Sequence, residues 1–142
     1  MRQSMAYLGF TMDDSLSDRK ALMKALSINQ QAILFQVSAV GTIEKPLLSY
    51  ILHSEKAISQ NTRNLALDRI RFFLSLNDDL NTFYRIGNSD PHFQPIIHRL
   101  YGYHQVKFLT PFESACWALL TGKVPIAEAR LAKRRLMRYY GR

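Results

Sequence analysis

The side chains whose types and spacing most clearly indicate a function are the cations near the C-terminus. Residues 122–142 hold seven lysines and arginines against one acid, Glu128, in a chain whose formal net charge is +8. The cations are Lys123, Arg130, Lys133, Arg134, Arg135, Arg138 and Arg142. Clustered positive charge commonly binds phosphate, because neutralising phosphates releases condensed counterions. A solvated helix face that keeps the protein soluble explains the same charge, so composition leaves both interpretations open.

Other residues that could carry chemistry are scattered along the chain. The six glycines include no two that are close together, which excludes a dinucleotide fingerprint and a phosphate-binding P-loop. The four histidines form no i, i+4 pair and there is one cysteine, so the sequence predicts no metal and no cofactor. Cys116 lies on an apolar helical stripe, which favours a buried small hydrophobe over a nucleophile. Asp78 and Asp79 suit a helix start better than acid–base catalysis.

The bulk composition is that of one globular domain, or of two small lobes that share a core. The chain has 142 residues, of which 47% are apolar and 21% charged. A single cysteine excludes an intrachain disulfide and is typical of a reducing compartment. No apolar run reaches the roughly 18 residues that a membrane span needs. We therefore predict a cytoplasmic protein without membrane contact, associated with the nucleoid if it binds DNA.

The elements that must position the cations begin with a small α+β lobe over residues 1–54. Residues 1–17 are polar and unpatterned, which predicts a leader without fixed structure. The segment RKALMKAL (19–26) predicts a short helix. Two β-rich runs at 32–40 and 46–54 predict an antiparallel pair of strands.

A helical region over residues 55–142 follows, because the apolar spacing changes there, and the predicted fold class is α+β. The first apolar stripe consists of Leu67, Ile70, Phe73 and Leu74. A second helix is expected to end at Gly87, a residue favoured at C-terminal stops. Asp90 as N-cap and Pro91 at the first helical position predict the start of a third helix.

The last 33 residues carry the clearest helix signals. Thr110 and Glu113 have the spacing of a capping box, with Pro111 at the first helical position. The apolar stripe of this helix is Phe112, Ala115, Cys116, Leu119 and Leu120. Gly122 is expected to end it, and Pro125 to begin the next helix. On that last helix the cations Arg130, Lys133, Arg134 and Arg138 share one face, opposite Ala129, Ala132, Leu136, Tyr139 and Tyr140. We expect the apolar face to pack and the basic face to meet a polyanion.

The order of these pieces over residues 65–141 resembles the helix-hairpin-helix DNA glycosylases, especially the alkylated-base (3-methyladenine type) branch. The matching pieces are Asp90-Pro91, Leu100-Tyr101-Gly102, Pro111-Phe112-Glu113, Trp117-Ala118-Leu119-Leu120, and the basic helix from Arg130 to Gly141. The resemblance implies an N-terminal sheet lobe followed by the first part of a helical domain. It also implies a monofunctional N-glycosylase that flips a damaged base out of duplex DNA.

Two parts of that family's pattern are missing from this sequence. Its DNA-gripping hairpin, of the L-P-G-I-G kind, and its catalytic aspartate would both lie beyond Arg142. The resemblance therefore assigns no catalytic residue, and we expect the 142-residue chain to be inactive alone.

The turn between the last two helices matches the family's approach to the minor groove. By position, Lys123 matches the family's residue that fills the gap left by the flipped base. Lysine stacks poorly between bases, but it binds phosphate well. The predicted DNA-binding residues are Thr121, Gly122, Lys123, Arg130, Lys133, Arg134 and Arg138. The alternative interpretation is that the segment TGKVP is only a connection between two helices.

The expected function is therefore base-excision repair, as the N-terminal part of a DNA-3-methyladenine-type glycosylase. The expected partners are double-stranded DNA and either a complementary C-terminal chain or a second copy, because Trp117, Leu119, Leu120 and Leu136 would otherwise be partly uncovered. Two alternatives stay open. One is a non-catalytic DNA-binding module, and the other is a helical adaptor that contacts proteins.

Overall fold

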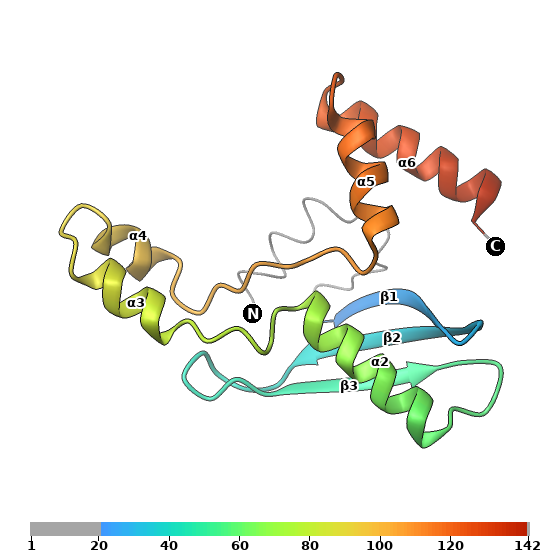
Figure 1. Cartoon of the computed structure of the whole chain (residues 1–142), viewed down its shortest axis with the longest axis horizontal. Helices are drawn as coiled ribbons and strands as arrows, with labels where there is room; N and C mark the ends of the chain where they lie inside the picture. Colours follow the sequence, from blue (N-terminus) through green and yellow to red (C-terminus); the bar gives the residue numbers. More distant parts are fainter. Residues whose placement is uncertain (1–20, 142) are drawn as a thin grey trace.

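A three-stranded antiparallel sheet with one helix across it forms the centre of the molecule (Figure 1). The computed structural model describes residues 21–141, so the leader predicted over residues 1–17 lies outside the described residues. The strands are β1 (Ala21–Ile28), β2 (Gln31–Ala39) and β3 (Leu48–His53), in the order β1-β2-β3. The strand pair predicted from the two β-rich runs is confirmed, with Phe35 opposite Leu52 and Val37 opposite Tyr50.

The helix predicted over residues 19–26 is wrong in the part that the structure describes, because residues 21–26 lie in β1. Asn29 and Gln30 both have positive φ, 49° and 62°, which is the backbone of a tight type I′ turn between two strands. This turn pairs β1 with β2 and brings Leu22 opposite Val37. Leu22 and Ile28 then lie in the core at 2% and 7% exposure. Burial across the sheet outweighs the weak local preference of a lysine- and leucine-rich segment for helix.

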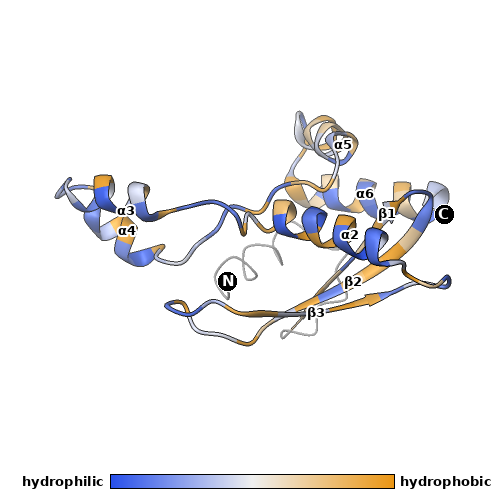
Figure 2. Cartoon of the chain, turned by 60° about the horizontal axis from the view of Figure 1, so that its bottom comes forward, coloured by the Kyte–Doolittle hydropathy of each residue, from blue (hydrophilic) through white to orange (hydrophobic). Residues whose placement is uncertain are grey.

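Helix α2 (Gln60–Phe73) supplies the other half of the core and packs on one face of the sheet (Figure 2). Ser59 caps its start by accepting a hydrogen bond from the backbone N–H of Thr62. The predicted stripe is confirmed at Ile70, Phe73 and Leu74, which are all buried. The rings of Phe35 and Phe73 meet edge to face, with centroids 6.1 Å apart. Residues of the sheet and of α2 therefore share one core, although they lie on opposite sides of the domain boundary predicted at residue 54. That boundary stays a prediction.

Helices α3 (Asn81–Asn88) and α4 (Gln94–Arg99) form a small hairpin that projects away from the sheet (Figure 1). Gly87 lies inside α3 and is buried, so its predicted role as a C-terminal stop is wrong. A Cβ at Gly87 would lie 2.6 Å from Cγ1 of Ile97, which means that the glycine allows α3 and α4 to approach closely.

The start predicted for α4 at Asp90 and Pro91 is three residues too early. The Asp90 carboxylate does accept a hydrogen bond from the backbone N–H of His92, at 2.8 Å. This hydrogen bond stabilises a turn and does not cap a helix, because α4 begins at Gln94. Pro95 falls in the first turn of α4, where a missing N–H costs little.

The last two helices are α5 (Pro111–Thr121) and α6 (Ile126–Tyr140), with bounds close to those predicted. Thr110 Oγ1 accepts from the backbone N–H of Glu113 at 3.0 Å, as the capping box requires. The Glu113 carboxylate instead accepts from the N–H of Leu109, one residue before the expected partner. The predicted α+β class is confirmed. Among residues 21–141, no helix is long and apolar enough to cross a membrane.

Candidate nucleic-acid interface

The turn between α5 and α6 places the predicted contact residues at an exposed tip. Lys123 is exposed in this turn, and the neighbouring Val124 is 42% exposed. Gly122 follows α5 as its C-cap with an ordinary right-handed backbone, φ −64° and ψ −26°. The hydroxyl of Thr121 donates to the carbonyl of Trp117 at 2.8 Å, so it closes the end of α5. Lys123 is therefore the residue of this turn with a cation to offer to phosphate.

The four predicted cations of α6 do not share one environment. Arg134 and Arg138 are exposed, as expected, and the adjacent Arg135 is exposed as well. Arg130 is half-buried, and its Nη2 atom is shielded from solvent. Lys133 is also half-buried, and its Nζ atom lies 5.8 Å from the ring centroid of Trp117 on α5. The structure therefore leaves Arg134 and Arg138 exposed on α6, whereas Arg130 is half-buried and Lys133 lies over the ring of Trp117 on α5.

The apolar face predicted for α6 is wrong in its C-terminal half. Ala129 is fully buried, as expected, but Tyr139 and Tyr140 are 76% and 79% exposed and Leu136 is 44% exposed. Only the N-terminal part of α6 packs, because its described neighbour is α5 and the two helices diverge from the turn (Figure 1). An apolar pattern tells which side of a helix prefers burial, but burial also needs a second surface within reach.

Helix α5 has no buried residue at all. The side chains of Phe112 and Leu119 are 75% and 83% exposed. Cys116, predicted as a buried small hydrophobe, is half-buried. Leu119 and Leu136, two of the four side chains expected to be partly uncovered without a partner, are 83% and 44% exposed.

The start of α5 is fixed to the sheet by an ion pair that the sequence did not reveal. Lys24 on β1 pairs with Glu113 on α5, and their side chains are 11% and 19% exposed. The ammonium group of Lys24 also lies 5.5 Å from the ring centroid of Phe73. Partners 89 residues apart leave no local signal in the sequence. This contact positions α5, and through it the basic turn, relative to the sheet.

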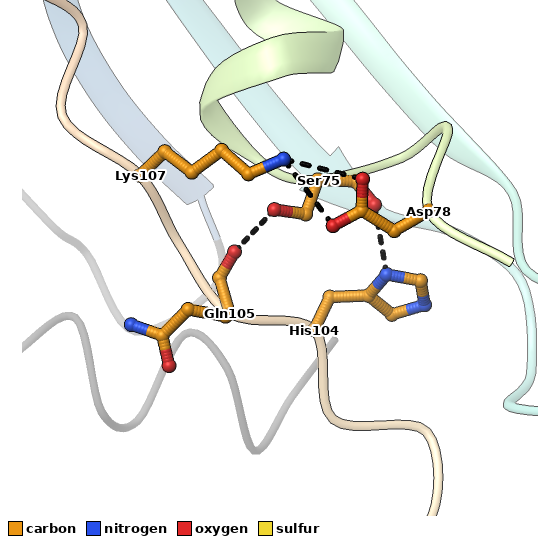
Figure 3. Close-up of polar contacts among 5 residues, drawn as sticks. All are labelled: Ser75, Asp78, His104, Gln105 and Lys107. Atoms are coloured by element: carbon orange, nitrogen blue, oxygen red, sulfur yellow. Dashed lines mark hydrogen bonds and ion pairs between the residues drawn. The ribbon is translucent and has the colours of Figure 1, made fainter. Parts of the chain in front are cut away.

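A second cluster of polar residues joins the turn that follows α2 to the segment that leads from α4 to α5 (Figure 3). The hydroxyl of Ser75 donates to the backbone carbonyl of Gln105, and Nδ1 of His104 lies 2.9 Å from the carbonyl oxygen of Ser75. Lys107 contacts both carboxylate oxygens of Asp78 at 3.2 Å. A serine, a histidine and an aspartate are close here, but the serine hydroxyl faces a backbone carbonyl and not the imidazole. The cluster therefore holds two segments together and has no arrangement for nucleophilic attack.

The described residues contain no group of three histidine, cysteine, aspartate or glutamate side chains that could hold a metal ion. What the α5–α6 hairpin offers is an exposed lysine at its tip and exposed arginines along α6. Such a surface has the positive charge that contact with a polyanion needs, and it belongs to an α+β protein with a basic helical hairpin.

The chain is similar to a protein of Bacillus subtilis (strain 168) named DNA-3-methyladenine glycosylase, with 22% identity over 143 residues. The alignment covers 99% of this chain and 46% of the relative, so the chain spans less than half the length of that relative. No family model matches the chain, and no solved structure matches it significantly. The similarity supports a relationship to glycosylases, whereas the helix-hairpin-helix assignment stays a prediction.

Proposed function

We propose that this chain is the N-terminal portion of a DNA-3-methyladenine-type glycosylase, which removes alkylated bases in base-excision repair. The observation that carries the proposal is the alignment of nearly the whole chain with a protein of that name. The basic hairpin supports it, since an enzyme that acts on bases in duplex DNA must first hold the phosphate backbone.

In this proposal the turn formed by Thr121, Gly122 and Lys123 approaches the double-stranded DNA. Lys123 contacts phosphate from the tip, and Arg134 and Arg138 extend the contact along α6. Lys133 supports this surface from the side that faces α5, where its ammonium group lies over the ring of Trp117. Arg130 is half-buried one turn before Lys133 and supports the same surface. These roles follow from exposure and charge, and none of them is a chemical step.

We further propose that the 142 residues alone do not cleave the N-glycosidic bond. The resemblance assigns no catalytic residue to this chain, and of the two carboxylates in the basic hairpin, that of Glu113 is engaged by Lys24 and by the N–H of Leu109. Activity then requires a complementary polypeptide that supplies the catalytic residue, whereas self-association of the chain would only cover its exposed apolar side chains.

Two measurements on the 142-residue protein test the proposal. Duplex DNA should bind with an affinity that falls steeply as salt rises, and no 3-methyladenine should be released from alkylated DNA above the uncatalysed rate. Clear turnover would refute the proposed inactivity. Absence of DNA binding at low salt would refute the DNA-contacting role of the hairpin.

A non-catalytic DNA-binding module is the second candidate, favoured by the exposed cations of α6. Such a module binds damaged and undamaged duplex equally, whereas a glycosylase portion gains affinity for damaged DNA when its complement is present. A protein-contacting adaptor is the third candidate, favoured by the exposed apolar side chains of α5. Protein binding without DNA binding at low salt would select the adaptor.

A further inference from the structure

The C-terminal end of α6 combines cations with exposed aromatic rings (Figure 1). Tyr139 and Tyr140 are 76% and 79% exposed, more than any other aromatic side chain in the described part of the chain. Arg135 and Arg138 are exposed as well. Arg135 lies four residues before Tyr139 and three before Arg138, so these three side chains are neighbours on one helical face, and Tyr140 flanks them. We call these four residues the α6 patch.

The two tyrosine rings contribute little to the fold of residues 21–141. The buried residue of α6 is Ala129, ten positions before Tyr139. Apolar surface stabilises a fold in proportion to the area removed from water, and most of the area of both rings stays in water. Neighbouring aromatic rings beside guanidinium groups are therefore a surface whose chemistry suits a ligand.

The charge around the patch selects the kind of ligand. The acid of α6, Glu128, lies in its first turn. Residues 129–141 carry cations and no acid. A polyanion complements such a surface. Nucleic acid provides a negative charge at every nucleotide, whereas a protein partner needs an acidic patch of its own.

We propose that the α6 patch binds unpaired bases of a nucleic-acid strand, with the rings of Tyr139 and Tyr140 stacked on bases and with Arg135 and Arg138 on adjacent phosphates. Aromatic side chains beside cations suit a single strand, because every base has a flat face for stacking and every nucleotide has a phosphate. Duplex DNA does not offer these faces, since its bases stack on one another and present their edges in the grooves.

This inference rests on the proposed function in taking nucleic acid as the partner of α6, and it adds a second form of that partner. Arg138 is shared with the duplex contact, whereas Arg135, Tyr139 and Tyr140 have no part in it. Unpaired bases occur in single-stranded or locally opened DNA and also in RNA. Stacking and phosphate contact are the same in both, so the experiment includes both.

Ligands of one length separate stacking from charge. They are a labelled oligothymidylate, an abasic strand with the same number of phosphates, an oligouridylate, and the duplex of the oligothymidylate with its complement. Fluorescence anisotropy at one salt concentration gives the Kd of the 142-residue protein for each ligand. We expect the oligothymidylate to bind about fivefold or more tightly than the abasic strand, because this is the contribution of a stacked base.

Substitutions assign this difference to the tyrosines. Tyr139→Ala combined with Tyr140→Ala should weaken oligothymidylate binding about fivefold or more and leave the abasic strand and the duplex unaffected. Tyr139→Phe combined with Tyr140→Phe should bind as the wild type does, because stacking needs the ring and not the hydroxyl. The control is Tyr50→Ala on β3, where Tyr50 is 41% exposed. It should change none of the affinities.

The arginine of the patch that has no part in the duplex contact is tested through its charge. Arg135→Ala should weaken binding of the oligothymidylate and of the abasic strand alike. It should also reduce the slope of log Kd against log salt by about 0.7 for each of them, since one phosphate contact to a single strand is lost. An unchanged slope would remove Arg135 from the patch.

Equal affinity of the wild-type protein for the oligothymidylate and the abasic strand would overturn the patch, and this result depends on no variant. Unchanged oligothymidylate binding by the double alanine variant would overturn it too, as would an equal loss for all ligands, which marks a structural role of the rings. Oligouridylate bound as tightly as oligothymidylate extends the patch to RNA, and weaker binding restricts it to DNA. Duplex binding without a preference for unpaired bases refutes the patch and keeps the proposed function, whereas the preference without duplex binding does the reverse.

Discussion

The hydroxyl of Ser75 donates a hydrogen bond to the backbone carbonyl of Gln105, 30 residues further along the chain. Ser75 is 1% exposed and has a positive φ of 53°. The backbone N–H of Lys107 donates to the carbonyl of Phe73 at 2.8 Å beside it. These contacts join the segment that leaves α2 to the segment that leads into α5 (Figure 3). The segments before and after the α3–α4 hairpin are therefore bonded to each other beside the core, and the hairpin is an insertion between them.

We predict that Ser75→Ala destabilises the protein by about 0.5–1.5 kcal/mol, because the hydrogen bond from the buried Ser75 hydroxyl to the Gln105 carbonyl is lost. Urea unfolding followed by circular dichroism measures the loss. The control is Ser89→Ala, since the hydroxyl of Ser89 also donates to a backbone carbonyl, that of Ile86, but at an exposed site. Equal effects of the two substitutions would contradict a special role for the buried bond.

The ion pair between Lys24 and Glu113 gives a second prediction. Glu113→Gln should destabilise the protein by about 3–5 kcal/mol, because it leaves the largely buried ammonium group of Lys24 without its counter-charge. Replacing both residues together, with Lys24→Met and Glu113→Leu, should cost less than the single change. The matched control is Asp78→Asn in the more exposed pair with Lys107, which should cost no more than about 1 kcal/mol. Thermal unfolding of the four proteins decides between these outcomes.

Two glycines that look alike in the sequence should respond in opposite ways to alanine. Gly87→Ala should destabilise by about 1–3 kcal/mol, because its Cβ would lie 2.6 Å from Cγ1 of Ile97. Gly122→Ala should be neutral or stabilising, since its backbone is right-handed and the nearest atom to its Cβ would be the Ala118 carbonyl oxygen at 3.3 Å. If Gly87→Ala costs less in an Ile97→Ala background, which removes both Cγ1 and Cδ1, the clash is confirmed as the cause. A neutral Gly87→Ala would contradict the close approach of α3 and α4.

The cations of the hairpin should separate into contact residues and packing residues. Lys123→Ala and Arg138→Ala should each reduce the slope of log Kd against log salt for duplex DNA by about one. Arg130→Ala should act mainly on the melting temperature, because part of its guanidinium group is shielded from solvent. Arg85→Ala on α3 is the control, an exposed arginine outside the hairpin, and should leave the slope unchanged. Equal slopes for wild type, Lys123→Ala and Arg138→Ala would show that the hairpin does not touch phosphate.

The sequence by itself determined the elements whose signals are local. The strands β2 and β3 follow from runs of β-branched and apolar residues, and α5 follows from Thr110, Pro111 and Glu113, which lie within one turn of each other. Gly122 and Pro125 locate the turn of the hairpin because backbone preferences act over a few residues. The concentration of cations in α6 is likewise a property of sequence alone.

Only the tertiary structure decided the features that depend on distant partners. The segment 21–28 is a strand because β2 lies beside it, and Gly87 is needed because Ile97 lies against it. The apolar spacing of α6 predicts which of its faces prefers burial. Only the part of that face near Ala129 is buried, and Tyr139 and Tyr140 are exposed. The Lys24–Glu113 and Ser75–Gln105 contacts join residues 89 and 30 positions apart. Such pairings form when the chain folds back on itself to bury its core, and no local pattern of residue types records which segments will meet.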